Sequence, residues 1–155
     1  MQEFPFDEID ELYSRVILDH HRKPRNCRHL LGPDIERDEY NPVCGDRVVL
    51  QIKLVRGLIR EIGFHGEGCA ISQASASMMT ESLNGKTLDG ARELSVAFRR
   101  IMARDADPTN GKNSALGDLE ALQAVRRLPV RIKCALLAWT ALEEGIDSYR
   151  TGTGP

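Results

Sequence analysis

Residues 47–65 read RVVLQIKLVRGLIREIGFH, and this stretch decides the fold class. Its first half places apolar side chains at every second position, which is the period of a β-strand with one buried face. A second apolar run begins at Leu58 and extends to His65. Gly57, between the two runs, can adopt the left-handed backbone that a tight turn requires. The stretch predicts an antiparallel hairpin whose first strand buries Val48, Leu50, Ile52 and Leu54.

The register of this hairpin follows from matching its apolar faces. A two-residue turn at Arg56 and Gly57 would place Glu61 opposite Ile52. A one-residue shift in pairing moves every side chain to the other face of a sheet, so we expect a three-residue loop over residues 55–57 instead. That loop pairs Leu54 with Leu58, Leu50 with Ile62 and Val48 with Phe64.

Helical patterns dominate on both sides of the hairpin. Gly85 is a helix stop, Pro129 suits the first turn of a helix, and residues 105–113 are dense in turn-forming side chains. A frayed polar tail is expected from Tyr149 onward. The order predicts one α+β domain over residues 1–150, with a small antiparallel sheet of about three strands against a helical layer, and a flexible tail over residues 151–155. The expected helices span residues 7–21, 72–84, 87–102, 116–125 and 129–146.

Composition and charge exclude several classes of protein. The chain has 155 residues, of which 41% are hydrophobic and 28% charged, so it does not have the composition of a disordered chain. The net charge of −2 argues against nonspecific binding of nucleic acid. The longest apolar run, near Trp139, is far shorter than the ~20 residues that span a membrane. Because no basic-then-apolar signal segment opens the chain, we expect a cytoplasmic protein without a membrane partner.

Four cysteines are therefore expected to stay reduced, which favours roles as metal ligands, nucleophiles or small core residues. Cys44 and Asp46 stand just before the first strand, Cys69 precedes a helix, and Cys134 lies early in the last helix. A thiolate near the first turn of a helix is stabilised by unpaired backbone amides. Three thiols and one carboxylate could converge on one tetrahedral Zn²⁺, although core packing is an equally ordinary role for free cysteine.

The glycines of Gly66-Glu67-Gly68 do not indicate a dinucleotide site. They follow a strand and precede a helix, but Ile71 stands where the fingerprint requires a third small residue, and no parallel crossover unit surrounds them.

Four segments of the chain resemble the U-type iron–sulfur assembly proteins. They read ILDHHRKPRN (residues 17–26), NPVCGD (41–46), FHGEGCAISQASAS (64–77) and LPVRIKCA (128–135). The resemblance extends from about Tyr13 to Ile146. Within the family it is greater to the SufU branch than to the IscU branch, because IscU-type scaffolds carry a histidine where this chain has Lys133.

This resemblance implies an IscU-like fold, a metal site and a partner. It implies zinc held by Cys44, Asp46, Cys69 and Cys134, and sulfur transfer onto Cys44 from a SufS-type, pyridoxal-phosphate-dependent cysteine desulfurase that the chain activates. The sulfur would pass to a downstream SUF cluster-assembly scaffold. The alternative is that the chain is itself a scaffold for a [2Fe–2S] cluster on the same four residues. A third alternative is a regulatory adaptor with a structural zinc. Cys27 matches no ligand of the family.

Arg131 and Asp46 are expected to assist Cys44. Zinc bound by three thiolates and a carboxylate carries net negative charge, and Arg131, three residues before Cys134, could offset it on the same helix face. Lys133 is a weaker candidate for this role. An oxygen donor suits this borderline-soft ion less well than sulfur, so Asp46 could give a site that opens without losing its metal.

Overall fold

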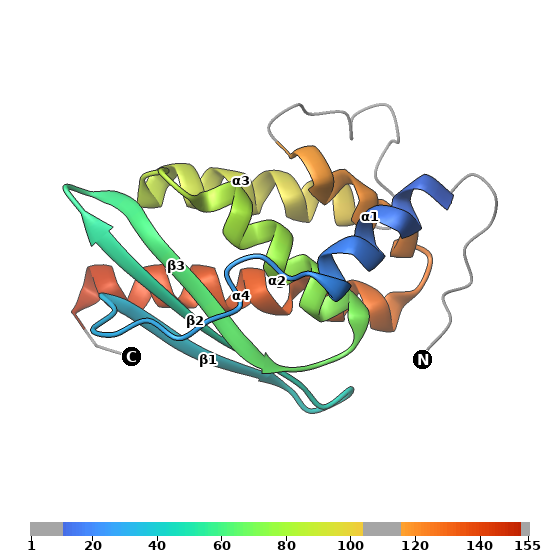
Figure 1. The fold of residues 1–155 in the computed structure, drawn as a ribbon, viewed down its shortest axis with the longest axis horizontal. Coiled ribbons are helices and arrows are strands. Elements are labelled where there is room, and N and C mark those ends of the chain that lie inside the picture. The colour runs from blue at the N-terminus through green and yellow to red at the C-terminus, as the bar shows by residue number, and fades with distance from the viewer. Residues whose placement is uncertain (1–10, 104–115, 153–155) are drawn as a thin grey trace.

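The computed structural model describes residues 11–103 and 116–152 and contains a three-stranded antiparallel sheet with five helices among those residues (Figure 1). The strands lie in the order β1-β2-β3. This arrangement confirms the α+β prediction, although only the β2–β3 hairpin had been located in the sequence. The elements are α1 (Glu11–Arg22), β1 (Ile35–Asn41), β2 (Asp46–Val55), β3 (Leu58–Glu67), α2 (Ala70–Leu83), α3 (Leu88–Met102), the 3-10 helix η3 (Gly117–Val125) and α4 (Pro129–Thr151).

The hairpin register was predicted incorrectly, although apolar residues do face apolar residues. Val55 pairs with Leu58 across a two-residue turn, in which Arg56 and Gly57 both have positive φ, at 55° and 79°. A bulge then leaves Arg60 without a partner in β2. The extra residue shifts the pairing by one position, so that apolar residues of β3 again face apolar residues of β2. The three-residue loop was expected to have this effect. Beyond the bulge Ile52 pairs with Ile62 and Leu50 with Phe64.

The centre of β2 is buried on both faces, which the predicted alternation did not anticipate. Val49 and Gln51 are both buried, on the face away from the helices. The chain before β1 runs along this side: Arg28 N–H donates to the Phe64 carbonyl at 3.0 Å, and Leu30 N–H donates to Gln51 Oε1 at 2.8 Å. This segment adds a short parallel bridge to β3 and accounts for the burial of Gln51.

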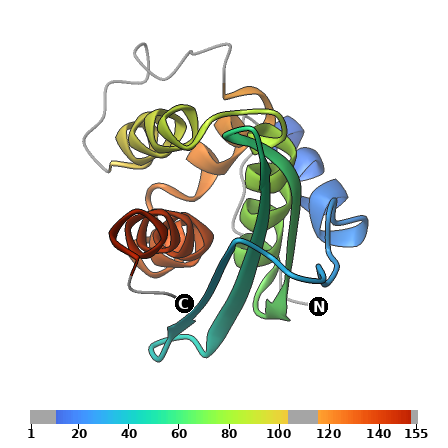
Figure 2. The ribbon, with the colours of Figure 1, turned by 90° about the vertical axis from the view of Figure 1, so that its left-hand side faces the viewer.

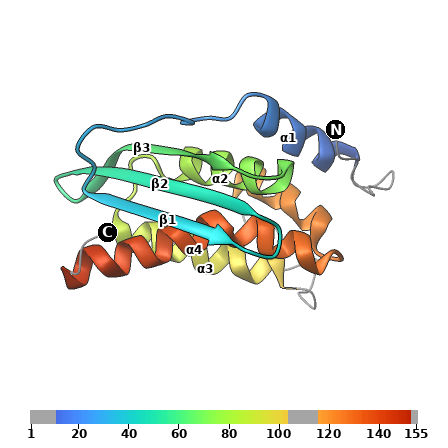
Figure 3. The same cartoon turned by 90° about the horizontal axis from the view of Figure 1, so that it is seen from below.

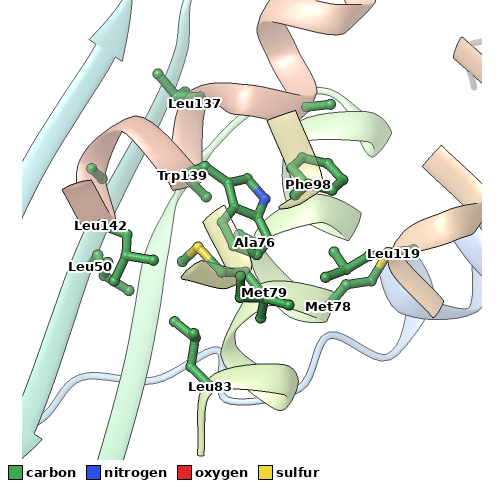
Figure 4. Close-up of a cluster of buried hydrophobic side chains, with 14 of the residues drawn as sticks. Leu50, Ala76, Met78, Met79, Leu83, Phe98, Leu119, Leu137, Trp139 and Leu142 are labelled. Atoms are coloured by element: carbon green, nitrogen blue, oxygen red, sulfur yellow. The ribbon is translucent and has the colours of Figure 1, made fainter. Parts of the chain in front are cut away.

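The helices form a layer on the other face of the sheet (Figures 1 and 2). α4 packs against β1 and β2, while α2 packs against β3 and α4. The largest core side chain, Trp139 of α4, stacks on Phe98 of α3 with ring centroids 4.7 Å apart (Figure 4). Met78 and Met79 of α2 complete this cluster. A core of this kind fixes α2 and α4 against the sheet and against each other.

Helix ends follow local signals with one exception. Gly85 adopts φ 84° after α2, and the Thr87 hydroxyl caps α3 by accepting from Gly90 N–H at 3.0 Å. The tail predicted from Tyr149 is wrong, because α4 continues through Thr151 and ends at Gly152 in the left-handed conformation. A helix with no stop signal continues until a glycine ends it. The start of the helix predicted over residues 7–21 and the turn-rich residues 105–113 lie outside the described residues.

Over the residues that the structure describes, no helix combines the length and apolarity needed to cross a membrane.

Candidate metal centre

Three segments that are distant in sequence meet at one end of the sheet (Figures 1 and 3). They are the β1–β2 turn over residues 42–45, the junction of β3 with α2, and the first turns of α4. Each contributes predicted site residues: Cys44 and Asp46 flank the start of β2, Cys69 precedes α2, and Cys134 lies in α4. The fold therefore brings all four candidate ligands to one region.

The β1–β2 turn presents Cys44 toward α4. Gly45 adopts φ 75° and its N–H donates to the Asn41 carbonyl at 2.8 Å, while Val43 N–H donates to Asn41 Oδ1 at 3.0 Å. These bonds show how Asn41 and Gly45 shape the turn. Cys44 is half-buried and the preceding Val43 is 69% exposed. Cys44 is thus partly exposed and lies next to an exposed apolar residue.

Cys69 is the N-cap of α2, and its sulfur accepts from Ser72 N–H at 3.5 Å. Its own N–H donates to Asp46 Oδ1 at 3.1 Å, and its sulfur lies 3.6 Å from Asp46 Oδ2. Asp46 is only 3% exposed. The carboxylate therefore lies against the start of α2, where unpaired helix amides stabilise negative charge.

Gly68 permits this close approach and was missed in the sequence. A Cβ atom at Gly68 would lie 2.2 Å from Ser72 Oγ and 3.2 Å from Asp46 Oδ1. A Cβ at Gly66, two residues earlier, would lie 2.1 Å from the Arg47 carbonyl oxygen. The two glycines that do not fit a dinucleotide motif are required by the backbone beside Cys69. The sequence signal that could have identified these glycines is their position immediately before the candidate ligand Cys69.

Cys134 closes the cluster from the helical layer. It is fully buried near the start of α4, and its sulfur lies 3.6 Å from the Cys44 sulfur. Ligand atoms of Cys44, Asp46 and Cys134 all lie within 4.8 Å of one another. Cys69 joins this group through its contact with Asp46.

The buried thiols have strongly shifted pKa values. A hydrogen bond from the Cys134 thiol lowers the pKa of Cys69 to about 6; burial opposes this shift, and the Ser72 N–H supports it. The same hydrogen bond, together with burial, raises the pKa of Cys134. A cation bound beside these two side chains would favour the thiolate form of both.

Two of the separations in this cluster fit the edges of a tetrahedral zinc site. Zn–S bonds of about 2.3 Å give a tetrahedron with S–S edges of about 3.8 Å, and a shorter Zn–O bond gives S–O edges of about 3.5 Å. The Cys44–Cys134 and Cys69–Asp46 separations, both 3.6 Å, match these edges. Three sulfurs and one oxygen are also a donor set that zinc accepts in proteins.

The remaining candidates lie at the edge of the site or away from it. Arg131 is half-buried in the first turn of α4, and Lys133 is exposed. Cys27 is exposed, and its backbone forms the parallel bridge with Phe64 of β3. It does not belong to the group of converging ligand atoms.

A second group of ligand-type side chains, His20, Glu81 and Asp118, has a structural explanation. The buried His20 ring contacts Ser77 Oγ through Nδ1 at 2.8 Å and Asp118 through Nε2 at 2.9 Å. Both ring nitrogens therefore have partners, and the group ties α1 to α2 and η3. We assign no metal to it.

Comparisons with known proteins agree with this geometry. The chain is 45% identical over 145 residues to a zinc-dependent sulfurtransferase, SufU, of Bacillus subtilis (strain 168), covering 93% of this chain and 95% of that protein. It is 37% identical over 139 residues to an iron–sulfur cluster assembly scaffold protein, IscU, of Streptococcus pyogenes serotype M1, covering 90% and 85%.

The fold is shared with solved structures. A crystal structure from Fervidobacterium islandicum AW-1, named as an iron–sulfur cluster assembly scaffold protein for the SUF system, superposes with a TM-score of 0.74 at 30% identity, covering 87% of this chain and 96% of that one. The model of the NifU-like N-terminal domain matches residues 12–154. The protein is a member of the NifU-like N-terminal domain family.

Proposed function

We propose that this chain is a zinc-dependent sulfurtransferase of iron–sulfur cluster assembly. It accepts sulfur on Cys44 from the persulfide of a SufS-type, pyridoxal-phosphate-dependent cysteine desulfurase, activates that enzyme, and passes the sulfur to a downstream SUF cluster-assembly scaffold. The observation that carries the proposal is the convergence of Cys44, Asp46 and Cys134, whose ligand atoms lie within 4.8 Å of one another. The Cys69 sulfur lies 3.6 Å from Asp46 Oδ2, beside this group. The 45% identity to a zinc-dependent sulfurtransferase supports the same reading.

Cys44, Asp46, Cys69 and Cys134 would hold the zinc. When bound, the ion supplies positive charge that keeps the three thiols deprotonated at neutral pH. Cys69 already favours the thiolate, because its pKa is lowered to about 6 by the hydrogen bond from Cys134. Reduced thiols are the rule in the cytoplasm, which is the location we propose. A net charge of −2 fits a protein partner rather than nucleic acid, and no membrane partner is proposed.

Cys44 is the residue placed to accept sulfur. It lies on a turn, is half-buried, and borders the exposed Val43. Its thiolate attacks the outer sulfur of the desulfurase persulfide, and the bond between the two persulfide sulfurs breaks. The electron pair leaves with the desulfurase cysteine as a thiolate, and Cys44 carries the persulfide. Neither an oxidant nor a reductant is needed, because one sulfur–sulfur bond is exchanged for another.

Asp46 and Arg131 assist in different ways. The Asp46 carboxylate, held by the Cys69 amide, keeps a charged oxygen at the site when Cys44 turns toward the partner. Arg131, in the first turn of α4, would offset the negative charge of the ligands. Both are positioning roles for the transfer at Cys44.

A scaffold for a [2Fe–2S] cluster is the second candidate function. The same four side chains can hold iron, and the Streptococcus pyogenes relative is named as a scaffold. Lys133 favours the transferase, because the resemblance places a histidine at this position in scaffolds of the IscU type.

Mass spectrometry after reaction with a desulfurase tests the proposal. The zinc-loaded chain is incubated with a SufS-type desulfurase and L-cysteine, and its peptides are then mapped without reduction. We expect one added sulfur atom on Cys44, and a Cys27→Ser variant serves as the matched control. A stable brown chromophore after reconstitution with iron and sulfide, with no sulfur on Cys44, would instead support the scaffold.

A further inference from the structure

A buried hydroxyl group joins the two helices that carry Cys69 and Cys134. Ser75 of α2 donates a hydrogen bond from Oγ to the Ala135 carbonyl oxygen at 2.6 Å, and it accepts one from Trp139 Nε1–H at 3.1 Å. All three residues are fully buried. One side chain of α2 therefore binds α4 at two points that lie one helical turn apart.

Both ends of this bridge lie close to candidate metal ligands. Ala135 directly follows Cys134, and Ser75 lies six residues after Cys69, about 9 Å along the helix axis. Because an α-helix is stiff over this length, a shift of Ser75 along α4 would move Cys69 by a similar distance. The separation of the two sulfurs is thereby linked to the bridge.

The bridge adds a directional restraint to the apolar packing between α2 and α4. The neighbours of Ser75 on α2, Ala74 and Ala76, are buried alanines, and contact between methyl groups has little directional preference. Hydrogen bonds, in contrast, weaken steeply when their angle or distance changes. The Ser75 bridge thus restrains how far α2 can slide along α4, in addition to the restraint from core packing.

We propose that Ser75 and Trp139 are positioning residues of the metal centre: their hydrogen bonds hold α2 and α4 in the register that places the Cys69 and Cys134 sulfurs for one tetrahedral ion. This inference rests on the proposed metal binding. Under this proposal the Ser75 hydroxyl and the Trp139 N–H control the affinity and geometry of the metal site, although neither group contacts a ligand atom.

Three variants test the bridge. Ser75→Ala removes both hydrogen bonds. Trp139→Phe removes only the N–H donor and retains an aromatic ring for the stack on Phe98. Ser95→Ala is the matched control, because Ser95 is also buried and binds α4, through Glu143, at a position distant in sequence from the ligands. For each full-length chain we would measure zinc affinity by competition with a chromophoric chelator, the absorption spectrum of the Co²⁺-substituted protein, and the unfolding temperature without metal.

We expect Ser75→Ala to weaken zinc binding about tenfold, with a smaller loss in Trp139→Phe. Both should shift the Co²⁺ d–d bands, which report the geometry of the ligands. Ser95→Ala should lower the unfolding temperature and leave affinity and spectrum unchanged. If Ser75→Ala does not fold, Trp139→Phe alone decides between these outcomes.

The bridge is only core packing if Ser75→Ala and Trp139→Phe match Ser95→Ala in zinc affinity and cobalt spectrum. That result, with one zinc bound per wild-type chain, would overturn this inference and leave the proposed function intact. A wild-type chain that binds no zinc would overturn both.

Discussion

The two sides of the metal centre are built differently. Cys69 caps the start of α2 and Cys134 lies in α4, and the Ser75 bridge connects the two helices. Cys44 belongs to a turn between two strands, beside the exposed Val43. Its sulfur contacts the rest of the site through Cys134, 3.6 Å away. One side is held in the packed helical layer, and the other lies on a partly exposed turn.

Because of this difference, we expect substitutions on the helical side to affect mainly zinc binding and substitutions on the turn to affect mainly sulfur transfer. A ligand in a helix cannot leave without disturbing the core, whereas a ligand on a turn can move while the fold persists. Asp46 lies between these two cases. It is the first residue of β2, next to the turn that carries Cys44, and it accepts a hydrogen bond from the backbone N–H of Cys69. The variants below are ordered by the size of the effect that this comparison predicts.

Replacing Cys44 should have the largest effect on transfer and a small effect on the fold. We expect Cys44→Ala to abolish sulfur acceptance, because the attacking sulfur is gone, and to retain zinc on the other three ligands with weaker affinity. Sulfur release from L-cysteine and metal content would be measured on the same sample. Transfer at the wild-type rate would show that another residue accepts the sulfur.

Cys134→Ala and Cys69→Ala should have the converse effect. Each removes a ligand on the anchored side, and zinc binding energy contributes to folding. We expect both variants to lower zinc occupancy and the unfolding temperature. The unfolding temperature of Cys134→Ala should fall by roughly 5–10 °C, because this variant also loses a fully buried side chain. Calorimetry with and without a chelator measures this. Unchanged zinc stoichiometry in both variants would rule out a shared site.

Asp46→Ala tests the ligand that lies between the two sides of the metal centre. We expect it to keep much of its zinc on the three thiolates and to lose most sulfur transfer. It should also lose about 1–3 kcal/mol of stability, since the Cys69 N–H loses its acceptor. Asp46→Asn is the matched variant: its amide oxygen can accept the same bond, so stability should return while transfer stays low. Wild-type turnover in either variant would make the carboxylate a bystander.

Gly68→Ala should perturb the site more mildly. The added methyl group would displace the Ser72 hydroxyl and crowd Asp46, so we expect zinc affinity to fall severalfold with the fold retained. Gly66→Ala is the contrasting variant, because its methyl group meets backbone rather than a side chain and should destabilise the β2–β3 pairing itself. Chelator competition and thermal unfolding of both variants distinguish the two effects.

Cys27→Ser should change nothing that is measured at the metal centre. Cys27 is exposed and lies outside the converging ligands. Zinc content and sulfur acceptance should equal those of the wild type. A large loss in either would mean that the fourth cysteine has a role in the site.

The sequence by itself determined the features that depend on neighbouring residues. The period of residues 47–65, the glycine at position 85 and the proline at position 129 predicted a hairpin and the helices around it, since local backbone preferences and side-chain alternation set these elements. Four short segments also indicated the ligand residues through family resemblance. The error at Tyr149 is of the same local kind, because the stop at Gly152 was not given enough weight.

Only the tertiary structure decided which residues meet. The bulge at Arg60, the burial of Gln51 and the Ser75 bridge arise where distant elements pack, and no local pattern encodes their contacts. The metal centre is of this kind as well: Cys44, Cys69 and Cys134 lie on a turn, a helix cap and a buried helix, and their sulfurs gather because the helical layer covers one face of the sheet. The alternation of side chains along a strand specifies which face of the sheet is buried. The core that packs on this face specifies the distances between residues that are far apart in sequence.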